Sequence, residues 1–129
     1  MAVEKPSRKH STHRTLFRGA LGVSIAVISY LAFTPLDLPG VSSLNDKVSH
    51  MIAFFCLAFL ADFSWPESPW NQLKFFLLLG YGLAIEVVQA FLPHRLFSLF
   101  DLSADAFGLI LYTLLLPWFM RHKLLKSLR

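Results

Sequence analysis

Four runs of apolar residues, separated by short polar segments, dominate the pattern of this chain. The runs cover residues 19–36, 48–61, 73–92 and 99–120. A helix needs about 20 residues to cross the hydrocarbon core of a bilayer. The second run reaches that length only if its polar flanks, at Asp46 and Trp65, lie at the two membrane interfaces. We therefore predict an all-α integral membrane bundle of four transmembrane helices.

The first run could also be interpreted as a cleaved signal peptide. Its apolar part is longer than the core of a typical signal peptide, and no A-x-A-like cleavage site follows it. Signal peptides combine a short apolar core with a small-residue site for the peptidase. We therefore expect a helix that is retained in the membrane.

The composition fits a membrane protein, and the net positive charge is better explained by orientation in a membrane than by nucleic acid binding. Hydrophobic residues make up 55% of the chain, and charged residues only 16%, against roughly 25% in soluble domains. The net charge is +4, which taken alone would suit nucleic acid binding. The Lys and Arg residues, however, flank the apolar runs, as they do in proteins oriented in a membrane. We therefore predict contact with the bilayer and no nucleic acid partner.

The positions of the basic residues predict the orientation. If the N-terminus lies inside, every Lys and Arg except Lys47 and Arg95 lies on the inner side. Short cytoplasmic loops carry such an excess of Lys and Arg, so we expect both termini in the cytoplasm. This topology divides the chain into three parts. They are a basic N-terminal segment (residues 1–18), a four-helix membrane domain (19–120) and a basic tail (121–129).

Ionisable residues interrupt three of the runs near their predicted outer ends. At 1.5 Å of rise per residue, His50, Glu86 and Asp105 fall at a similar depth on three separate helices. A second tier lies closer to the surface and consists of Asp46, Lys47, Gln89, Arg95 and Asp101. Charged groups that face lipid are costly, so these side chains should point inward. We predict a polar pocket inside the bundle that opens to the outer side.

Small residues mark the faces on which the helices should approach one another, because they let two backbones come close. The positions are Gly22 and Ala26 in the first run, Gly82 in the third and Gly108 in the fourth. Gly82 shares its face with Glu86, and Gly108 shares its face with Asp105. His50 shares its face with Ala53 and Ala61, which would allow close approach, and with Leu57, which would not. We therefore expect these faces, with that of Gly22 and Ala26, to be the ones on which the helices pack.

Three short motifs carry these polar residues. They are D-K-x-x-H at 46–50, E-x-x-Q at 86–89 followed by F-L-P-H-R up to Arg95, and D-L-S-A-D-A-F-G at 101–108. Their order and spacing cover over half of the chain and resemble the VanZ-like membrane proteins, named for a teicoplanin-resistance protein. The family usually has Asn where this chain has Asp105.

The resemblance implies a multi-pass protein of the bacterial plasma (inner) membrane, linked to the cell envelope and to glycopeptide resistance. It also implies a distant relationship to enzymes that act on lipid head groups. The expected partner is a membrane lipid or a lipid-linked envelope precursor. The resemblance implies no cofactor, and the residues give no reason to expect an organic one.

Several functions remain open for the predicted pocket. In an enzyme, His50, Glu86 and Asp105 would be the catalytic acid and base groups. The second-tier residues would bind the substrate, with Arg95 and Lys47 on a phosphate or carboxylate. A divalent metal bound by His50, Glu86 and the two Asp residues is chemically reasonable, but no H-E-x-x-H signature supports it, and we assign no metal ligand. The alternatives are a non-catalytic binding or scaffolding module, a small transporter working as an oligomer, and a network that only fixes helix packing.

Overall fold

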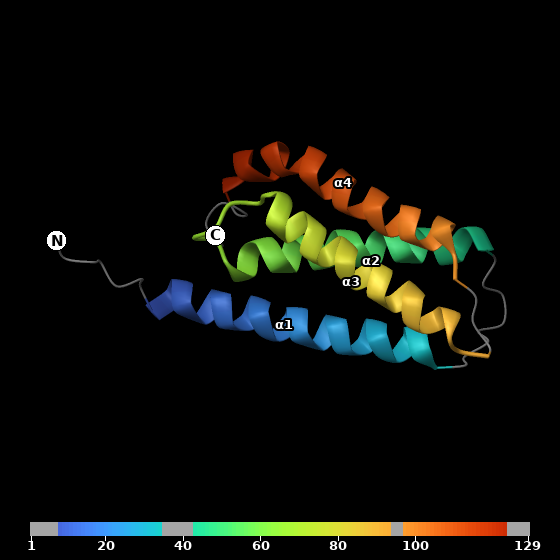
Figure 1. The fold of residues 1–129 in the computed structure, drawn as a ribbon. Helices are drawn as coiled ribbons and strands as arrows, with labels where there is room; N and C mark the ends of the chain where they lie inside the picture. Colours follow the sequence, from blue (N-terminus) through green and yellow to red (C-terminus); the bar gives the residue numbers. More distant parts are fainter. Residues whose placement is uncertain (1–7, 35–42, 94–96, 124–129) are drawn as a thin grey trace.

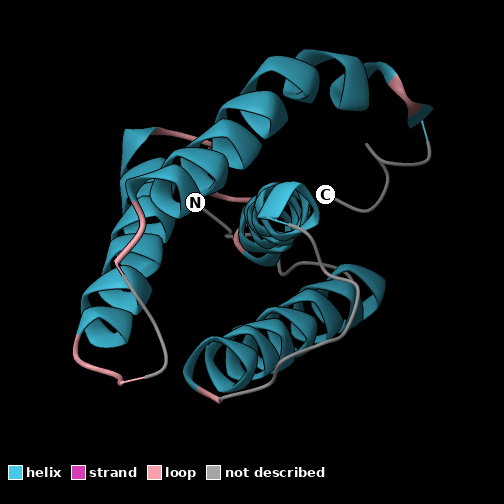
Figure 2. Ribbon diagram, turned by 90° about the vertical axis from the view of Figure 1, so that its right-hand side faces the viewer, coloured by secondary structure: helices cyan, strands magenta, loops and turns pink. Residues whose placement is uncertain are grey.

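The protein is built from four α-helices. The structure, a computed structural model, describes residues 8–34, 43–93 and 97–123. The helices are α1 (Arg8–Phe33), α2 (Ser43–Ser64), α3 (Gln72–Ala90) and α4 (Leu99–Arg121). The residues described contain no strand, as the cyan and pink ribbon of Figure 2 shows. The all-α prediction is confirmed for this part of the chain.

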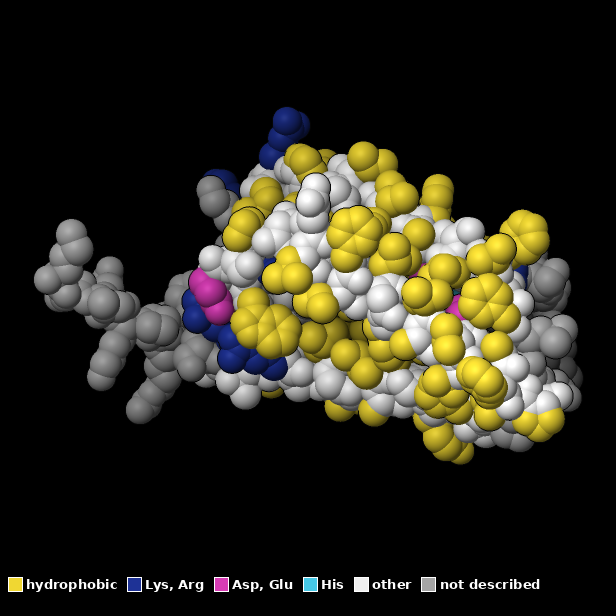
Figure 3. All heavy atoms as spheres, in the orientation of Figure 1, with side chains coloured by type: hydrophobic (Ala, Val, Ile, Leu, Met, Phe, Trp, Pro, Cys, Tyr) yellow, Lys and Arg dark blue, Asp and Glu magenta, His cyan; other side chains and the backbone are white. Residues whose placement is uncertain are grey.

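All four helices are long and apolar enough to cross a membrane. The surface between their ends is covered with large apolar side chains, many of them on the face drawn in Figure 3. The interior, by contrast, holds the buried polar residues Asp62, Ser64, Glu86, Gln89 and Asp105. A monomeric soluble protein rarely exposes so much contiguous apolar surface. The arrangement is that of a multi-pass membrane protein, in which the apolar surface faces lipid.

The ends of the helices follow from local sequence. Asn71 caps α3, since its side chain accepts a hydrogen bond from the Lys74 amide at 3.1 Å. Ser98 caps α4 in the same way, through the Asp101 amide at 3.2 Å. Such caps satisfy amides that have no partner within the first turn. They place the starts of α3 and α4 within one residue of the predicted starts.

The helix α1 extends beyond the apolar run that predicts it. It begins at Arg8, so residues 8–18 of the basic segment are helical and continuous with the apolar part. Residues 8–18 contain no Pro or Gly, and Arg and Lys are good helix formers. Arg14 and Arg18 lie 3.6 and 3.8 Å from Glu67 in the connection between α2 and α3. The basic segment is therefore packed on the bundle at this point.

The bundle is organised around α2, which contacts each of the other three helices and packs most extensively on α4. α1 and α4 lie on opposite sides of α2 and α3 (Figure 1) and do not contact each other. The start of α1 and the end of α4 lie at the same end of the bundle, which we call the proximal end. The other end, where α1 and α3 finish and α2 and α4 begin, is the distal end.

The predicted helix contacts at Gly82 and Gly108 are confirmed. A Cβ atom at Gly108 would overlap the Met51 carbonyl oxygen, so the backbones of α4 and α2 touch here. A Cβ atom at Gly82 would lie 2.8 Å from Asp105 Oδ2 and 3.1 Å from the ring of Phe54. These glycines let α3 and α4 approach the centre of the bundle.

The prediction for α1 is wrong. Gly22 and Ala26 are exposed, and a Cβ atom at Gly22 would meet nothing within 4 Å. α1 instead packs through larger side chains on another face, which are Leu21, Ile25 and Ile28. Ser29, close to this second face, hydrogen-bonds Tyr81 of α3 at 2.6 Å. Van der Waals contact of bulky side chains and several polar contacts, of which this is one, hold α1 in place without close backbone approach at Gly22.

Candidate functional site at the distal end

His50 of α2 lies between two carboxylates of α4. Its Nδ1 is 2.9 Å from Asp105 Oδ1, and its Nε2 is 3.9 Å from Asp101 Oδ2. Asp101 and Asp105 are one helical turn apart, so both can face the same imidazole. In the tautomer with its proton on Nδ1, His50 donates to Asp105, which orients the ring and leaves the lone pair on Nε2. In that tautomer His50 can accept a proton at Nε2.

Lys47 lies one turn before His50 on α2 and forms an ion pair with Asp101. The Lys47 side chain is 32% exposed, the His50 side chain 22% and the Asp101 side chain 14%. Asp105, deeper on α4, is only 2% exposed. Exposure thus falls from Lys47 through His50 and Asp101 to Asp105.

Glu86 of α3 completes the group from a third helix. It is fully buried, and its Oε2 accepts a hydrogen bond from the Ser98 amide at 3.0 Å. It lies within electrostatic range of Asp101, His50 and Asp105. Its Oε1 is buried and has no hydrogen-bond partner among the residues described. A buried side-chain oxygen without a hydrogen-bond partner is rare in folded proteins, and where one occurs it often has a functional role.

The structure therefore brings together five of the eight predicted site residues. They are Lys47, His50, Glu86, Asp101 and Asp105. Gln89 does not join them, because its Nε2 donates to the Ala32 carbonyl of α1 at 2.9 Å. The side chain of Asp46 and the whole of Arg95 lie outside the residues that the structure describes.

A second polar group, at the proximal end, was not predicted. Asp62 of α2 is fully buried, and its Oδ2 accepts a hydrogen bond from the Tyr112 hydroxyl at 2.6 Å. Lys74 Nζ lies 3.5 Å from Asp62 Oδ1 and donates to the carbonyls of Ser68 at 2.7 Å and Trp65 at 3.0 Å. Asp62 lies in the polar flank that we expected at a membrane interface, and Lys74 is one of the basic residues that predict the orientation. The position of Tyr112 on the same face as Asp105 was the one signal that could have revealed the group.

The described residues contain no group of three or more His, Cys, Asp and Glu side chains arranged to hold a metal ion. The five residues at the distal end, which we call the distal group, include His50, Glu86, Asp101 and Asp105. These side chains are paired with one another and do not surround a single point. Lys47 also places a positive charge within the group. The metal-site alternative gains no geometric support from this part of the chain.

The fold and this group of side chains define a multi-pass helical membrane protein with a buried polar cluster at one end. Comparison with known protein families and with solved structures finds no match. The uncharacterized protein C11E3.10 of Schizosaccharomyces pombe is 35% identical to this chain over an alignment of 126 positions, and the match covers 94% of this chain and 75% of the yeast protein. The chain belongs to the same family as this fission yeast protein. A fungal relative lends no support to a bacterial plasma membrane or to glycopeptide resistance.

Proposed function

We propose that this protein is a VanZ-like membrane enzyme that acts on the head group of a membrane lipid or lipid-linked molecule. The three motifs that resemble the VanZ-like family supply every residue of the distal group. The chain and its fission yeast relative share 35% identity, so the lipid class should be one found in fungal as well as bacterial membranes. The bacterial plasma membrane stays a prediction of the resemblance alone.

The observation that carries this proposal is a histidine placed between two carboxylates of the neighbouring helix, with a third, buried carboxylate within electrostatic range. Asp105 and Glu86 are carboxylates within membrane-spanning helices. Asp105 is 2% exposed, and Glu86 is fully buried. Interhelical hydrogen bonds in membranes contribute only about 0.6 kcal/mol each. A mid-membrane carboxylate costs about 2.5 to 3.5 kcal/mol on insertion scales. Packing alone is therefore a weak reason to keep these groups, whereas intramembrane ionisable residues commonly mark functional sites.

The geometry supports water activation by His50. Water would attack the phosphorus or carbonyl carbon of the head group while Nε2 of His50 takes its proton. Asp105 would stabilise the imidazolium through Nδ1–H, as carboxylates do in acid–base pairs of this kind. The bond to the leaving oxygen breaks, and His50 returns the proton to that oxygen. No nucleophilic Ser or Cys is needed in this scheme.

The remaining residues would bind the substrate and hold the site together. Lys47, with Arg95, would hold a phosphate or carboxylate of the substrate. Asp101 positions the Lys47 ammonium. Asp46 directly precedes Lys47 in α2. Gln89 would act indirectly, because its bond to Ala32 fastens α3 to α1. Glu86 Oε1 would face the substrate or the attacking water.

We also propose that the distal end faces the outside and that both termini are cytoplasmic. The distribution of Lys and Arg supports this orientation, and an even number of crossings puts both ends on one side. The test is thiol labelling in intact cells, in a Cys56→Ala background. A membrane-impermeant maleimide should label Phe97→Cys at once and Ser68→Cys only after permeabilisation. Labelling in the opposite order would show that the protein is inverted.

The enzymatic activity can be tested in reconstituted vesicles. The purified full chain is placed in vesicles made from the total lipid extract of its host, and lipid head groups are followed by mass spectrometry. Acid–base groups contribute about 10²- to 10⁴-fold to rate, so His50→Gln should slow conversion by at least about 100-fold. Tyr30→Phe, on the exposed side of α1, is the matched control and should convert lipid at the wild-type rate. Equal head-group profiles for wild type and His50→Gln would refute the enzyme.

A further inference from the structure

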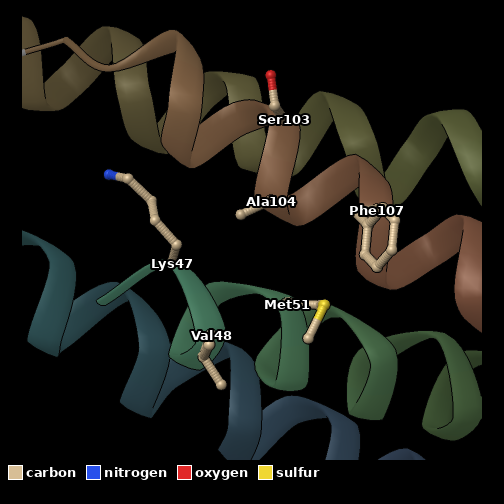
Figure 4. A pocket seen from close by; sticks show the side chains of 6 residues that line it. All are labelled: Lys47, Val48, Met51, Ser103, Ala104 and Phe107. Carbon is tan, nitrogen blue, oxygen red and sulfur yellow. The ribbon is translucent and has the colours of Figure 1, made fainter. Parts of the chain in front are cut away.

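A groove of about 290 Å³ runs between α2 and α4 beside the distal site. Its lining consists of Lys47, Val48, Met51, Ser103, Ala104 and Phe107. Figure 4 shows α2 and α4 as its two walls, with Met51 and Phe107 facing each other across one end. Lys47 and Met51 are one turn apart, which corresponds to about 6 Å along the helix. The groove therefore spans about one helical turn of α2 and is open to the surface of the bundle.

The walls of the groove offer almost no polar contacts. The Ser103 hydroxyl donates to the Leu99 carbonyl of its own helix at 2.8 Å and points away from the groove (Figure 4). Val48 is 40% and Phe107 is 56% exposed, so the groove opens sideways from the bundle. In a bilayer this side faces the acyl chains. A molecule could enter the groove laterally without passing through water.

Lys47 connects the groove with the polar site. Its aliphatic stem lies along the groove, and its ammonium pairs with Asp101, whose other oxygen is 3.9 Å from His50 Nε2. The Lys47–Asp101 ion pair thus lies at the distal end of an otherwise apolar groove. A single molecule with an apolar chain and an anionic group matches the groove and, by taking the place of Asp101, the Lys47 ammonium.

We propose that this groove holds one acyl chain of an anionic phospholipid whose phosphate binds Lys47. The phosphate would compete with Asp101 for the ammonium, and the head group would then lie one helical turn from His50. This inference rests on the proposed function and specifies the substrate as an anionic lipid that enters between α2 and α4.

The two parts of the lipid would contribute differently to binding. Lipid tails are as apolar as a Leu side chain, so moving a chain from the bilayer into the groove gains no hydrophobic free energy. The groove would instead fix the direction of the chain. Preference among lipids would come from the phosphate and Lys47, because one Lys at an anionic membrane surface contributes about a fivefold gain in affinity.

Photocrosslinking tests the proposal without any need for turnover. The full chain is reconstituted in phosphatidylcholine vesicles with a trace of phosphatidylglycerol that carries a diazirine on one acyl chain. A phosphatidylcholine probe with the same acyl chain is used in parallel. We expect crosslinks concentrated on Met51 and residues 104–107, with about fivefold more labelling by the anionic probe. Ala104→Trp, which fills the groove, should remove this labelling, whereas Ala84→Trp on the exposed side of α3 should not.

Two further variants separate the head group from the chain. Lys47→Gln should abolish the preference for the anionic probe and leave labelling by the zwitterionic one. Asp101→Asn, which removes the competitor of the phosphate, should increase the preference. Crosslinks spread evenly over all exposed helix faces would overturn the groove as a binding site, and equal labelling by both probes would overturn the role of Lys47. Either result could occur while lipid turnover still depends on His50, so failure here is distinct from failure of the proposed enzyme.

Discussion

Replacing Gly108 by Ala should destabilise the bundle by about 3 kcal/mol, because overpacking a well-packed contact commonly costs about 1–3 kcal/mol. The new methyl group would overlap the Met51 carbonyl oxygen and lie 3.2 Å from the Phe55 amide nitrogen. These are backbone atoms of α2, which cannot rotate away, so α2 and α4 must separate. Unfolding of the purified protein in mixed detergent micelles at increasing SDS content measures the change.

Two other glycines provide controls for this substitution. A Cβ atom at Gly80 would meet nothing within 4 Å, so Gly80→Ala should change stability by less than about 1 kcal/mol, in the stabilising direction. Gly82→Ala would meet the Asp105 carboxylate at 2.8 Å and the Phe54 ring at 3.1 Å. Its effect should be intermediate, because both are side-chain atoms and neither belongs to the backbone. If Gly108→Ala unfolds at the same SDS content as Gly80→Ala, the close contact of α2 and α4 is wrong.

Replacing Lys74 by Met should cost a similar amount, about 3 kcal/mol, through loss of a charge pair. Asp62 is fully buried and Lys74 is 11% exposed, and removing one partner of a buried ion pair typically costs about 3–5 kcal/mol. The substitution also removes the bonds from Lys74 Nζ to the Trp65 and Ser68 carbonyls, which hold the connection between α2 and α3. The same SDS titration measures the loss.

A double variant shows whether the loss arises from the stranded charge. Asp62→Asn keeps an oxygen that can accept the Tyr112 hydrogen bond but carries no charge. Combined with Lys74→Met, it should recover most of the lost stability. Lys123→Met, at an exposed position, is the matched control and should be neutral. Equal stabilities for Lys74→Met and Lys123→Met would mean that the buried pair contributes nothing.

The number of helices and their approximate ends could be predicted because the apolar runs are long and interrupted by few charges. The start of α1 could not, because basic residues that flank a membrane span are equally compatible with a helix and with an irregular segment. The packing face of α1 was also beyond prediction. Gly22 and Ala26 satisfied the small-residue rule, but the bulky face with Leu21 buries more surface against α2 and α3.

The distal site was predictable in part because charge inside an apolar run is costly and must find a partner. That argument located His50, Glu86 and Asp105 at one depth without showing which atoms meet. Gln89 shares a face with Glu86, yet its partner, the Ala32 carbonyl, depends on where α1 packs. The Asp62 group was missed because a polar residue near the end of a run also fits a membrane interface.

The most direct test of the proposed site is the lipid profile of cells that carry Glu86→Gln in place of the wild-type protein. The amide oxygen of Gln can still accept the hydrogen bond that Ser98 donates to Glu86, so the SDS titration should differ little from wild type. We predict that the lipid and lipid-linked precursor profile of these cells matches that of cells lacking the protein. A wild-type profile, or a changed profile that accompanies an equal loss of folded protein, would contradict a chemical role for this buried carboxylate.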